Sequence, residues 1–240
     1  MPLQDVSGNG IPDFIDSAMV IFDHVWSVEI VQLGYPAPPS IDGTPVEVYN
    51  VYFSNLPYYG LTWFDKEIPA LPGENYTSYM EVHHNFSGFY SPGLSGLKVT
   101  AAHEFHHAIQ MGYNVRSEDF FFYEMTSTWI EDLIYPDIND YYQYLDSFFR
   151  EVSNTSFDLY NGTTLFPYAN MLYIQMIEKQ FGADMVRQIW EKFLSVDLAM
   201  EAIINTLAQA PYYTPWQESL NQYGLWLYYT GDRAITDQYF

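Results

Sequence analysis

Residues 103–107 read HEFHH, which places two histidines four positions apart with a glutamate after the first, the pattern H-E-x-x-H. On a helix, residues four apart lie on one face, so His103 and His107 can present their imidazoles to a single cation. Glu104 can then reach a water molecule on that cation without being a ligand. The spacing predicts a zinc site in which Glu104 acts as the general base.

The remaining protein ligand is expected to be a carboxylate. The chain contains no cysteine, and His107 is the last of its six histidines, so neither a thiolate nor a further imidazole follows the motif. Two imidazoles and one carboxylate leave a zinc position open for water, as in catalytic sites.

Residues 123–132 read YEMTSTWIED, and with this segment the chain resembles the gluzincins, zinc peptidases whose third ligand is a glutamate on a second helix. The resemblance implies that Glu124 is the third ligand and that Glu131 occupies the family's second acidic position. Tyr123 and Met125 depart from the asparagine and glycine often found beside the ligand. The order of motifs from DVSGNGIPD through TAAHEFHHAIQ to TGDR is similar to that of secreted prokaryotic gluzincin-like metalloproteases.

Other polar residues are candidates to support this site. Glu131, with Thr128 as an alternative, is expected to accept a hydrogen bond from a ligand imidazole. Tyr168 or Tyr113 is a candidate donor to the oxyanion formed during peptide hydrolysis. The remaining histidines are interpreted as packing or hydrogen-bonding residues. His83 and His84 lie on a predicted strand whose edge could hold an extended substrate, but an ordinary half-buried strand is the favoured interpretation.

A calcium-type loop is predicted near the N-terminus, where residues 5–16 read DVSGNGIPDFID. Gly10 stands at the sixth loop position, where a calcium loop turns sharply, and the seventh position supplies a backbone carbonyl. Serine at the third position and aspartate at the twelfth should weaken the affinity, and the alternative is an ordinary turn before an Asp-capped helix. The predicted ligands are Asp5, Ser7, Asn9, Ile11, Asp13 and Asp16.

Periodicity predicts an α+β, zincin-like fold with an N-terminal helix, a small, mostly antiparallel sheet, an active-site helix and a C-terminal helical subdomain. A helix is expected over 13–33, with a buried stripe at Ile15, Met19, Phe22, Trp26, Ile30 and Leu33. Strands are expected over 46–53, 60–64 and 77–83, followed by helices over 95–112, 121–135, 139–151, 166–181, 183–195, 197–209 and 215–229. Residues 1–135 and 136–240 form the two predicted subdomains of one catalytic unit.

The charge excludes some partners. The chain carries 30 acidic and 8 basic residues, for a net charge of −22, so a nucleic-acid phosphate backbone would be repelled. No apolar run is long enough for a membrane helix, and no signal peptide is predicted within this chain. We expect an extracellular or cell-surface monomer.

These patterns favour a zinc peptidase, and an endopeptidase because no motif for gripping a substrate N-terminus is visible. The expected partner is a peptide or protein substrate. Two alternatives are a cell-surface glycan-binding or adhesion module and an inactive peptidase-like scaffold, each with a structural zinc. A fourth protein ligand that closes the metal site would favour the first alternative, whereas the intact His103, Glu104 and His107 argue against the second.

Overall fold

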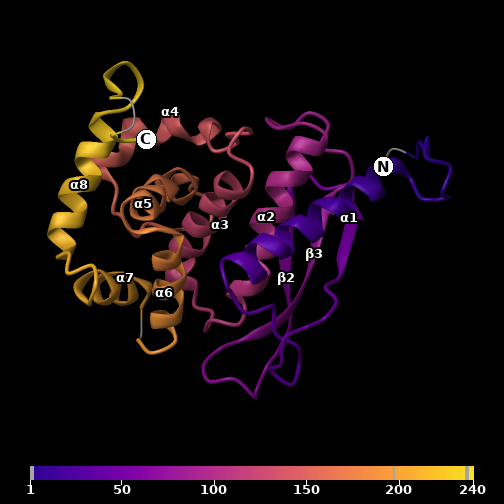
Figure 1. Cartoon of the computed structure of the whole chain (residues 1–240), viewed down its shortest axis with the longest axis horizontal. Coiled ribbons are helices and arrows are strands. Elements are labelled where there is room, and N and C mark those ends of the chain that lie inside the picture. The colour runs from indigo at the N-terminus through magenta and orange to yellow at the C-terminus, as the bar shows by residue number, and fades with distance from the viewer. Residues whose placement is uncertain (1–2, 197, 236–237) are drawn as a thin grey trace.

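The structure is a computed structural model that describes residues 3–196, 198–235 and 238–240. The chain begins with helix α1 (Asp13–Trp26), which continues as a π-helical turn over Ser27–Gln32. A small sheet follows, made of β1 (Val51–Ser54), β2 (Gly60–Glu67) and β3 (Tyr76–His83). The helical remainder comprises α2 (Leu94–Gln110), α3 (Phe120–Ile134), α4 (Tyr142–Glu151), α5 (Phe166–Phe181), α6 (Ala183–Phe193), α7 (Ala199–Ala208) and α8 (Trp216–Tyr228) (Figure 1).

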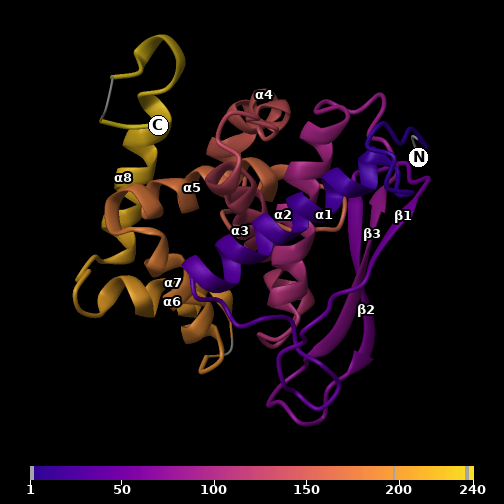
Figure 2. The same cartoon turned by 45° about the vertical axis from the view of Figure 1, so that its right-hand side comes forward.

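The sheet is mixed and has the strand order β1-β3-β2. β2 pairs antiparallel with β3, whereas the shorter β1 pairs parallel with it. The strands lie along one side of the molecule and α1 crosses α2 beside them (Figure 2). The predicted α+β class is confirmed, and the strand expected from residue 46 begins only at Val51.

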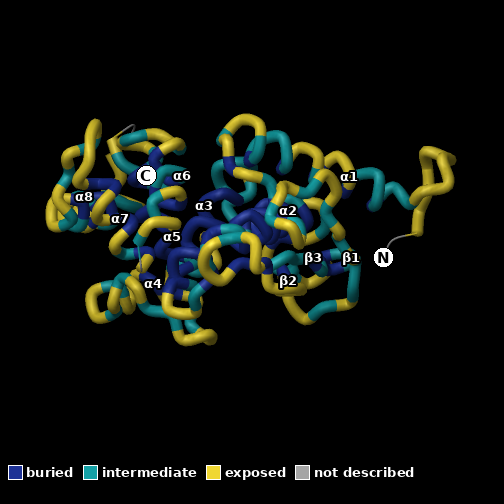
Figure 3. Tube along the Cα trace, turned by 90° about the horizontal axis from the view of Figure 1, so that it is seen from below, coloured by how far each residue is buried: buried dark blue, intermediate teal, exposed yellow. Residues whose placement is uncertain are grey.

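Helix α2 occupies the centre of the fold. It packs against α1, β2 and β3 and also against α3, which in turn packs against α5. Its small residues Gly96, Ala101, Ala102 and Ala108 are buried and allow neighbouring elements to approach closely. The buried part of the chain accordingly runs through α2, α3 and α5 (Figure 3).

The helices after the sheet lie close to their predicted ranges, since Gly182 and the prolines near residues 211 and 215 separate them. One buried hydrophobic cluster contains residues from Phe14 to Trp226 and so includes both halves of the chain. The division into two subdomains stays a prediction. No helix in the described ranges is long and apolar enough to cross a bilayer.

The predicted buried stripe of α1 is wrong in position. The residues that are buried are Phe14, Ala18, Ile21 and Val25, whereas Met19 is 48% exposed. The other predicted stripe residues are partly buried against the core. The buried face of the helix includes the small Ala18 and, in the π-helical turn, the acidic residue Glu29. A prediction from hydropathy alone does not count these two residues as buried, so it places the buried face at the wrong residues.

Candidate metal centre

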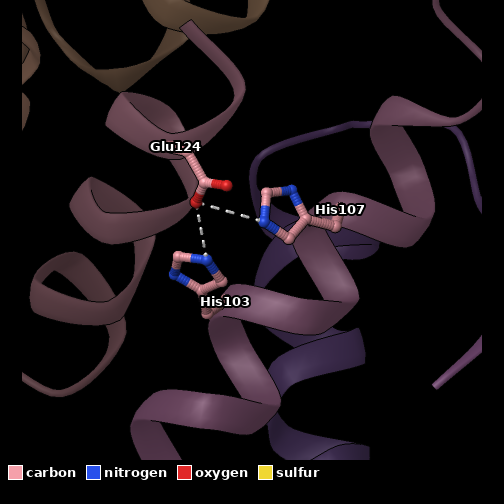
Figure 4. Close-up of side chains that lie close together, drawn as sticks. All are labelled: His103, His107 and Glu124. Carbon is pink, nitrogen blue, oxygen red and sulfur yellow. Dashed lines mark hydrogen bonds and ion pairs between the residues drawn. The ribbon is translucent and has the colours of Figure 1, made fainter. Parts of the chain in front are cut away.

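Three side chains converge between α2 and α3. His103 and His107 lie one turn apart on α2, and Glu124 projects from α3 toward both rings (Figure 4). Glu124 Oε2 lies 3.2 Å from His103 Nε2 and 3.5 Å from His107 Nε2. One ligand atom from each residue falls within 4.8 Å of the others, a spacing that could hold a metal ion.

The ring nitrogen of His103 that does not face Glu124 lies beside a second carboxylate. Its Nδ1 lies 2.6 Å from Glu131 Oε1, and both residues are buried. A carboxylate oxygen accepts, so Nδ1 carries the hydrogen, and Nε2 is the nitrogen that faces Glu124. Burial opposes the charged imidazolium, yet Glu124 and Glu131 together raise the pKa of His103 well above 6.5.

The orientation of His107 is set by residues that the sequence reasoning did not identify. Its Nδ1 lies 2.7 Å from Gln110 Oε1 and 3.1 Å from Ser127 Oγ. The Gln110 amide nitrogen donates to the carbonyl of Tyr123 at 3.1 Å, which fixes the amide oxygen toward His107. His107 therefore also presents Nε2 to the centre. Thr128, the predicted alternative partner, does not do this, because its buried Oγ1 makes no hydrogen bond with the described residues.

The donor set fits a cation. Two imidazole lone pairs and a carboxylate oxygen point at one another, so a proton or a metal ion must lie among them to offset their repulsion. Burial alone would raise the pKa of Glu124, but His107 and His103 hold it well below 4.5. Two imidazoles and one carboxylate are ligands that suit zinc among several divalent metals.

Glu104 is buried beside this group and is held by strand β2. Thr62 Oγ1 lies 2.8 Å from Glu104 Oε2 and also 2.8 Å from the Glu104 carbonyl. The strand approaches α2 so closely at Gly60 that an added Cβ would lie 2.6 Å from Thr100 Cγ2 and 3.0 Å from Glu104 Cγ. A side chain at residue 60 would therefore displace Glu104 or the strand.

The two candidate oxyanion donors lie in different places, and only one of them is beside the candidate metal ligands. Tyr168 lies at the centre, with its ring stacked on that of His103 at a centroid distance of 5.7 Å. Burial, together with the Glu124 carboxylate, raises the pKa of Tyr168, so its hydroxyl keeps a hydrogen to donate. Tyr113 instead packs against Trp190, near the Arg187–Glu191 ion pair. We therefore discard the prediction for Tyr113.

The candidate metal ligands line two separate cavities. One has a volume of about 180 Å³ and is lined by His103, Glu104 and Tyr168 together with further acidic and tyrosine residues. The other has a volume of about 150 Å³ and is lined by His107, Glu124 and mainly apolar and aromatic residues of β2 and α3. Strand β2 contributes to both, with Gly60 in the first and Thr62 in the second.

The other histidines lie outside the group. His106 Nδ1 is 2.7 Å from Glu29 Oε2, and both side chains are completely buried. Burial raises the pKa of Glu29 and lowers that of His106, which keeps both groups neutral. His24 lies on α1 with its ring 5.7 Å from that of Tyr135.

The strand that carries His83 is not a sheet edge. β3 lies between β1 and β2, and the neighbouring His84 backbone N–H donates to the Ser54 carbonyl, so this strand cannot hold a substrate on a free edge. The substrate-edge alternative for His83 and His84 is therefore wrong, and the favoured interpretation of an ordinary half-buried strand is confirmed. The edge strand beside the candidate centre is β2.

The N-terminal loop is folded by its own hydrogen bonds. Asp5 accepts the backbone N–H groups of Gly8 at 2.7 Å and Gly10 at 2.9 Å, and the Gly10 bond is the main cause of the lowered pKa of Asp5. Asp13 accepts the N–H of Val6 at 3.1 Å. A calcium ion here stays a prediction. The six proposed positions lie in this loop and the first turn of α1: Asp5, Ser7, Asn9, Ile11, Asp13 and Asp16.

Residues 91–207 match the model of a family of unknown function, DUF6055. The match covers just under half of the 240 residues and includes α2 and α3, which carry the candidate ligands. No curated protein and no solved structure matches the chain. The similarity therefore includes the helices of the centre and assigns them no activity.

Proposed function

We propose that this protein is a gluzincin-type zinc endopeptidase that hydrolyses peptide bonds. The observation that carries the proposal is the convergence of two imidazole Nε2 atoms and Glu124 Oε2, with the buried carboxylate of Glu104 beside them. The decisive test is zinc-dependent cleavage of an unfolded protein, compared between the native chain and a variant without the Glu104 carboxylate.

The chemistry divides among residues of this chain. Bound zinc supplies Lewis acidity, which acidifies a water molecule and polarises the scissile carbonyl. Glu104, positioned by Thr62, accepts the proton of the attacking water and delivers it to the leaving amine. Tyr168 donates its hydroxyl hydrogen to the developing oxyanion. Glu131 and Gln110 hold the two imidazoles with Nε2 toward the metal.

An extended peptide is the substrate shape that the sheet supports. β2 is an edge strand of the sheet, and its residues line both of the cavities that the candidate metal ligands line. A peptide paired with such an edge gains backbone hydrogen bonds and places alternate side chains in adjacent pockets. This geometry supports cleavage within a chain.

Zinc affinity should rise with pH. The raised pKa of His103 means that the metal-free protein holds a proton on this ring at neutral pH, and zinc must displace it. The dissociation constant should fall by about tenfold per pH unit while that proton is bound, then level off above the folded-state pKa. Chelator competition over a series of pH values measures this slope.

The same proton also makes the stability of the metal-free protein depend on pH, and this stability falls as pH rises. The raised pKa stabilises the metal-free protein fully below 6.5, and this contribution is lost as pH rises through the folded-state value. The melting temperature of metal-free protein should therefore fall relative to that of the zinc-loaded protein on going to alkaline pH. A pH-independent zinc affinity would show that His103 is already neutral in the metal-free state.

Calcium binding by the N-terminal loop is a separate part of the proposal, and millimolar calcium outside cells suits both its weak ligand set and an exported protein. Millimolar calcium should raise the melting temperature of the native chain, because an ion bound only by the folded state stabilises it. Asp5→Ala should remove that increase, whereas Asp42→Ala, in another exposed turn, should retain it. An unchanged melting temperature in the native chain would remove calcium from the proposal.

A further inference from the structure

The cavity lined by His103 is acidic and partly enclosed. Its lining includes the carboxylates of Glu104, Glu131 and Asp140, and none of these forms an ion pair with a lysine or arginine among the described residues. All three residues are buried, with Asp140 only 5% exposed. Glu131 is paired with the His103 ring at 2.6 Å, whereas Glu104 and Asp140 have only neutral hydrogen-bond donors among the described residues. A carboxylate that loses water without gaining a countercharge is costly, so Asp140 favours a ligand that supplies one.

Asp140 is held in place but retains capacity to accept. The Tyr59 hydroxyl donates to Oδ1 at 3.1 Å, and the Gln143 amide donates to Oδ2 at 2.6 Å. A carboxylate has about four acceptor positions, so two neutral donors leave room for a charged one. Tyr59 is itself fixed, since its oxygen accepts the Ser91 backbone N–H at 2.9 Å.

An unpaired hydroxyl and aromatic walls complete the cavity. Thr100 lines it, is 3% exposed, and its Oγ1 has no hydrogen-bond partner among the described residues. Tyr144 and Tyr168 lie side by side on its wall with ring centroids 5.2 Å apart. Tyrosine faces attract cations, and their edges pack against an alkyl chain.

We propose that this cavity is a subsite for a positively charged group of the substrate, an alkylammonium or guanidinium, with Asp140 as its anchoring carboxylate. The proposal rests on the proposed peptidase function and names its substrate class. The charge could come from a lysine or arginine side chain next to the scissile bond or from the α-ammonium group of a peptide. The first source gives an endopeptidase with basic specificity, and the second gives an aminopeptidase.

The first arm of the test measures binding without turnover. Calorimetric titration of the zinc-loaded protein should compare leucine methylamide, which has an α-ammonium, with N-acetyl-lysine methylamide and the uncharged N-acetyl-norleucine methylamide. One of the two cations should bind at least about tenfold more tightly than the neutral ligand, because it meets a buried carboxylate. Equal binding of all three would overturn the subsite. If both cations bind equally, the charge alone is recognised.

The second arm uses variants and peptides. Asp140→Asn should remove the preference for the cation, whereas Asp137→Asn, an exposed acid in the same loop, should retain it. Cleavage of matched peptides with free or acetylated N-termini, and with lysine or norleucine before the scissile bond, should show the same preference. An unchanged preference in Asp140→Asn would overturn the assignment, and if that variant does not fold, the native chain's ligand comparison still decides.

Two further outcomes separate this inference from the proposed function. Preferential cation binding with no cleavage of any peptide would refute the peptidase and keep the subsite. Cleavage with no preference for charge would keep the peptidase and refute the subsite. A second equivalent of zinc that is lost in Asp140→Asn would assign the cavity to a metal ion and also refute it.

Discussion

Glu104→Gln should bind zinc as the native chain does and lose peptide cleavage by roughly 10²–10⁴-fold in kcat, the usual contribution of a general base. The amide has the shape of the carboxylate and can still accept the hydrogen bond from Thr62. It cannot accept the proton of an attacking water. Metal content by atomic emission and kcat on a quenched peptide measure the two properties in one preparation.

The matched control is Glu118→Gln, which removes the same charge at an exposed position just before α3. It should retain both zinc and turnover. Turnover at the native rate in Glu104→Gln would refute the assigned base. A native chain that binds zinc and cleaves no unfolded protein would instead favour the peptidase-like scaffold with a structural metal.

Glu124→Gln should lose zinc affinity by more than about 100-fold. Loss of a residue that only hydrogen-bonds to a ligand typically costs about 10–100-fold, and loss of a ligand itself should cost more. The substitution removes the only carboxylate in the group of three and leaves two imidazoles. Cleavage should fall in parallel at limiting zinc and recover partly as zinc is added. Chelator competition gives the affinity, and a zinc titration of activity gives the recovery.

The comparison variant for this position is Glu131→Gln, which changes an acceptor for His103 rather than a proposed ligand. Its loss of affinity should be the smaller of the two. Equal zinc affinity in Glu124→Gln and the native chain would mean that the carboxylate lies near the imidazoles without ligating the metal. The proposed centre would then lack its third protein ligand.

The sequence predicts the helices and the imidazole pair well because both depend on local spacing. H-E-x-x-H fixes His103 and His107 on one helical face, and glycine and proline separate the helices that follow. Glu131 and Tyr168 were also located near the centre, and both lie beside His103. Glu131 shares α3 with Glu124, two turns later on the same face, whereas Tyr168 lies on α5, which no motif spacing relates to the centre.

The contacts that the sequence does not predict are set by packing between distant elements. Thr62 reaches Glu104 only because β2 is the edge strand against α2, and no spacing rule relates residues 42 positions apart. Gln110 and Ser127 are different, since each lies three residues after a proposed ligand on the same helical face. That spacing could have identified them, but it does not separate Ser127 from Thr128, which lies four residues after Glu124.

The buried pair of Glu29 and His106 has a consequence for shortened versions of the protein. His106 directly precedes a proposed metal ligand, and its partner comes from the turn that ends the first helix. Deleting the first helix together with its π-helical turn would leave the His106 ring buried without its hydrogen-bond partner, at a cost of about 1–3 kcal/mol for the lost hydrogen bond alone. The first helix and its π-helical turn thus support the residue of α2 that directly precedes a proposed ligand, and a domain shortened to α2 and the later helices would lack that contact.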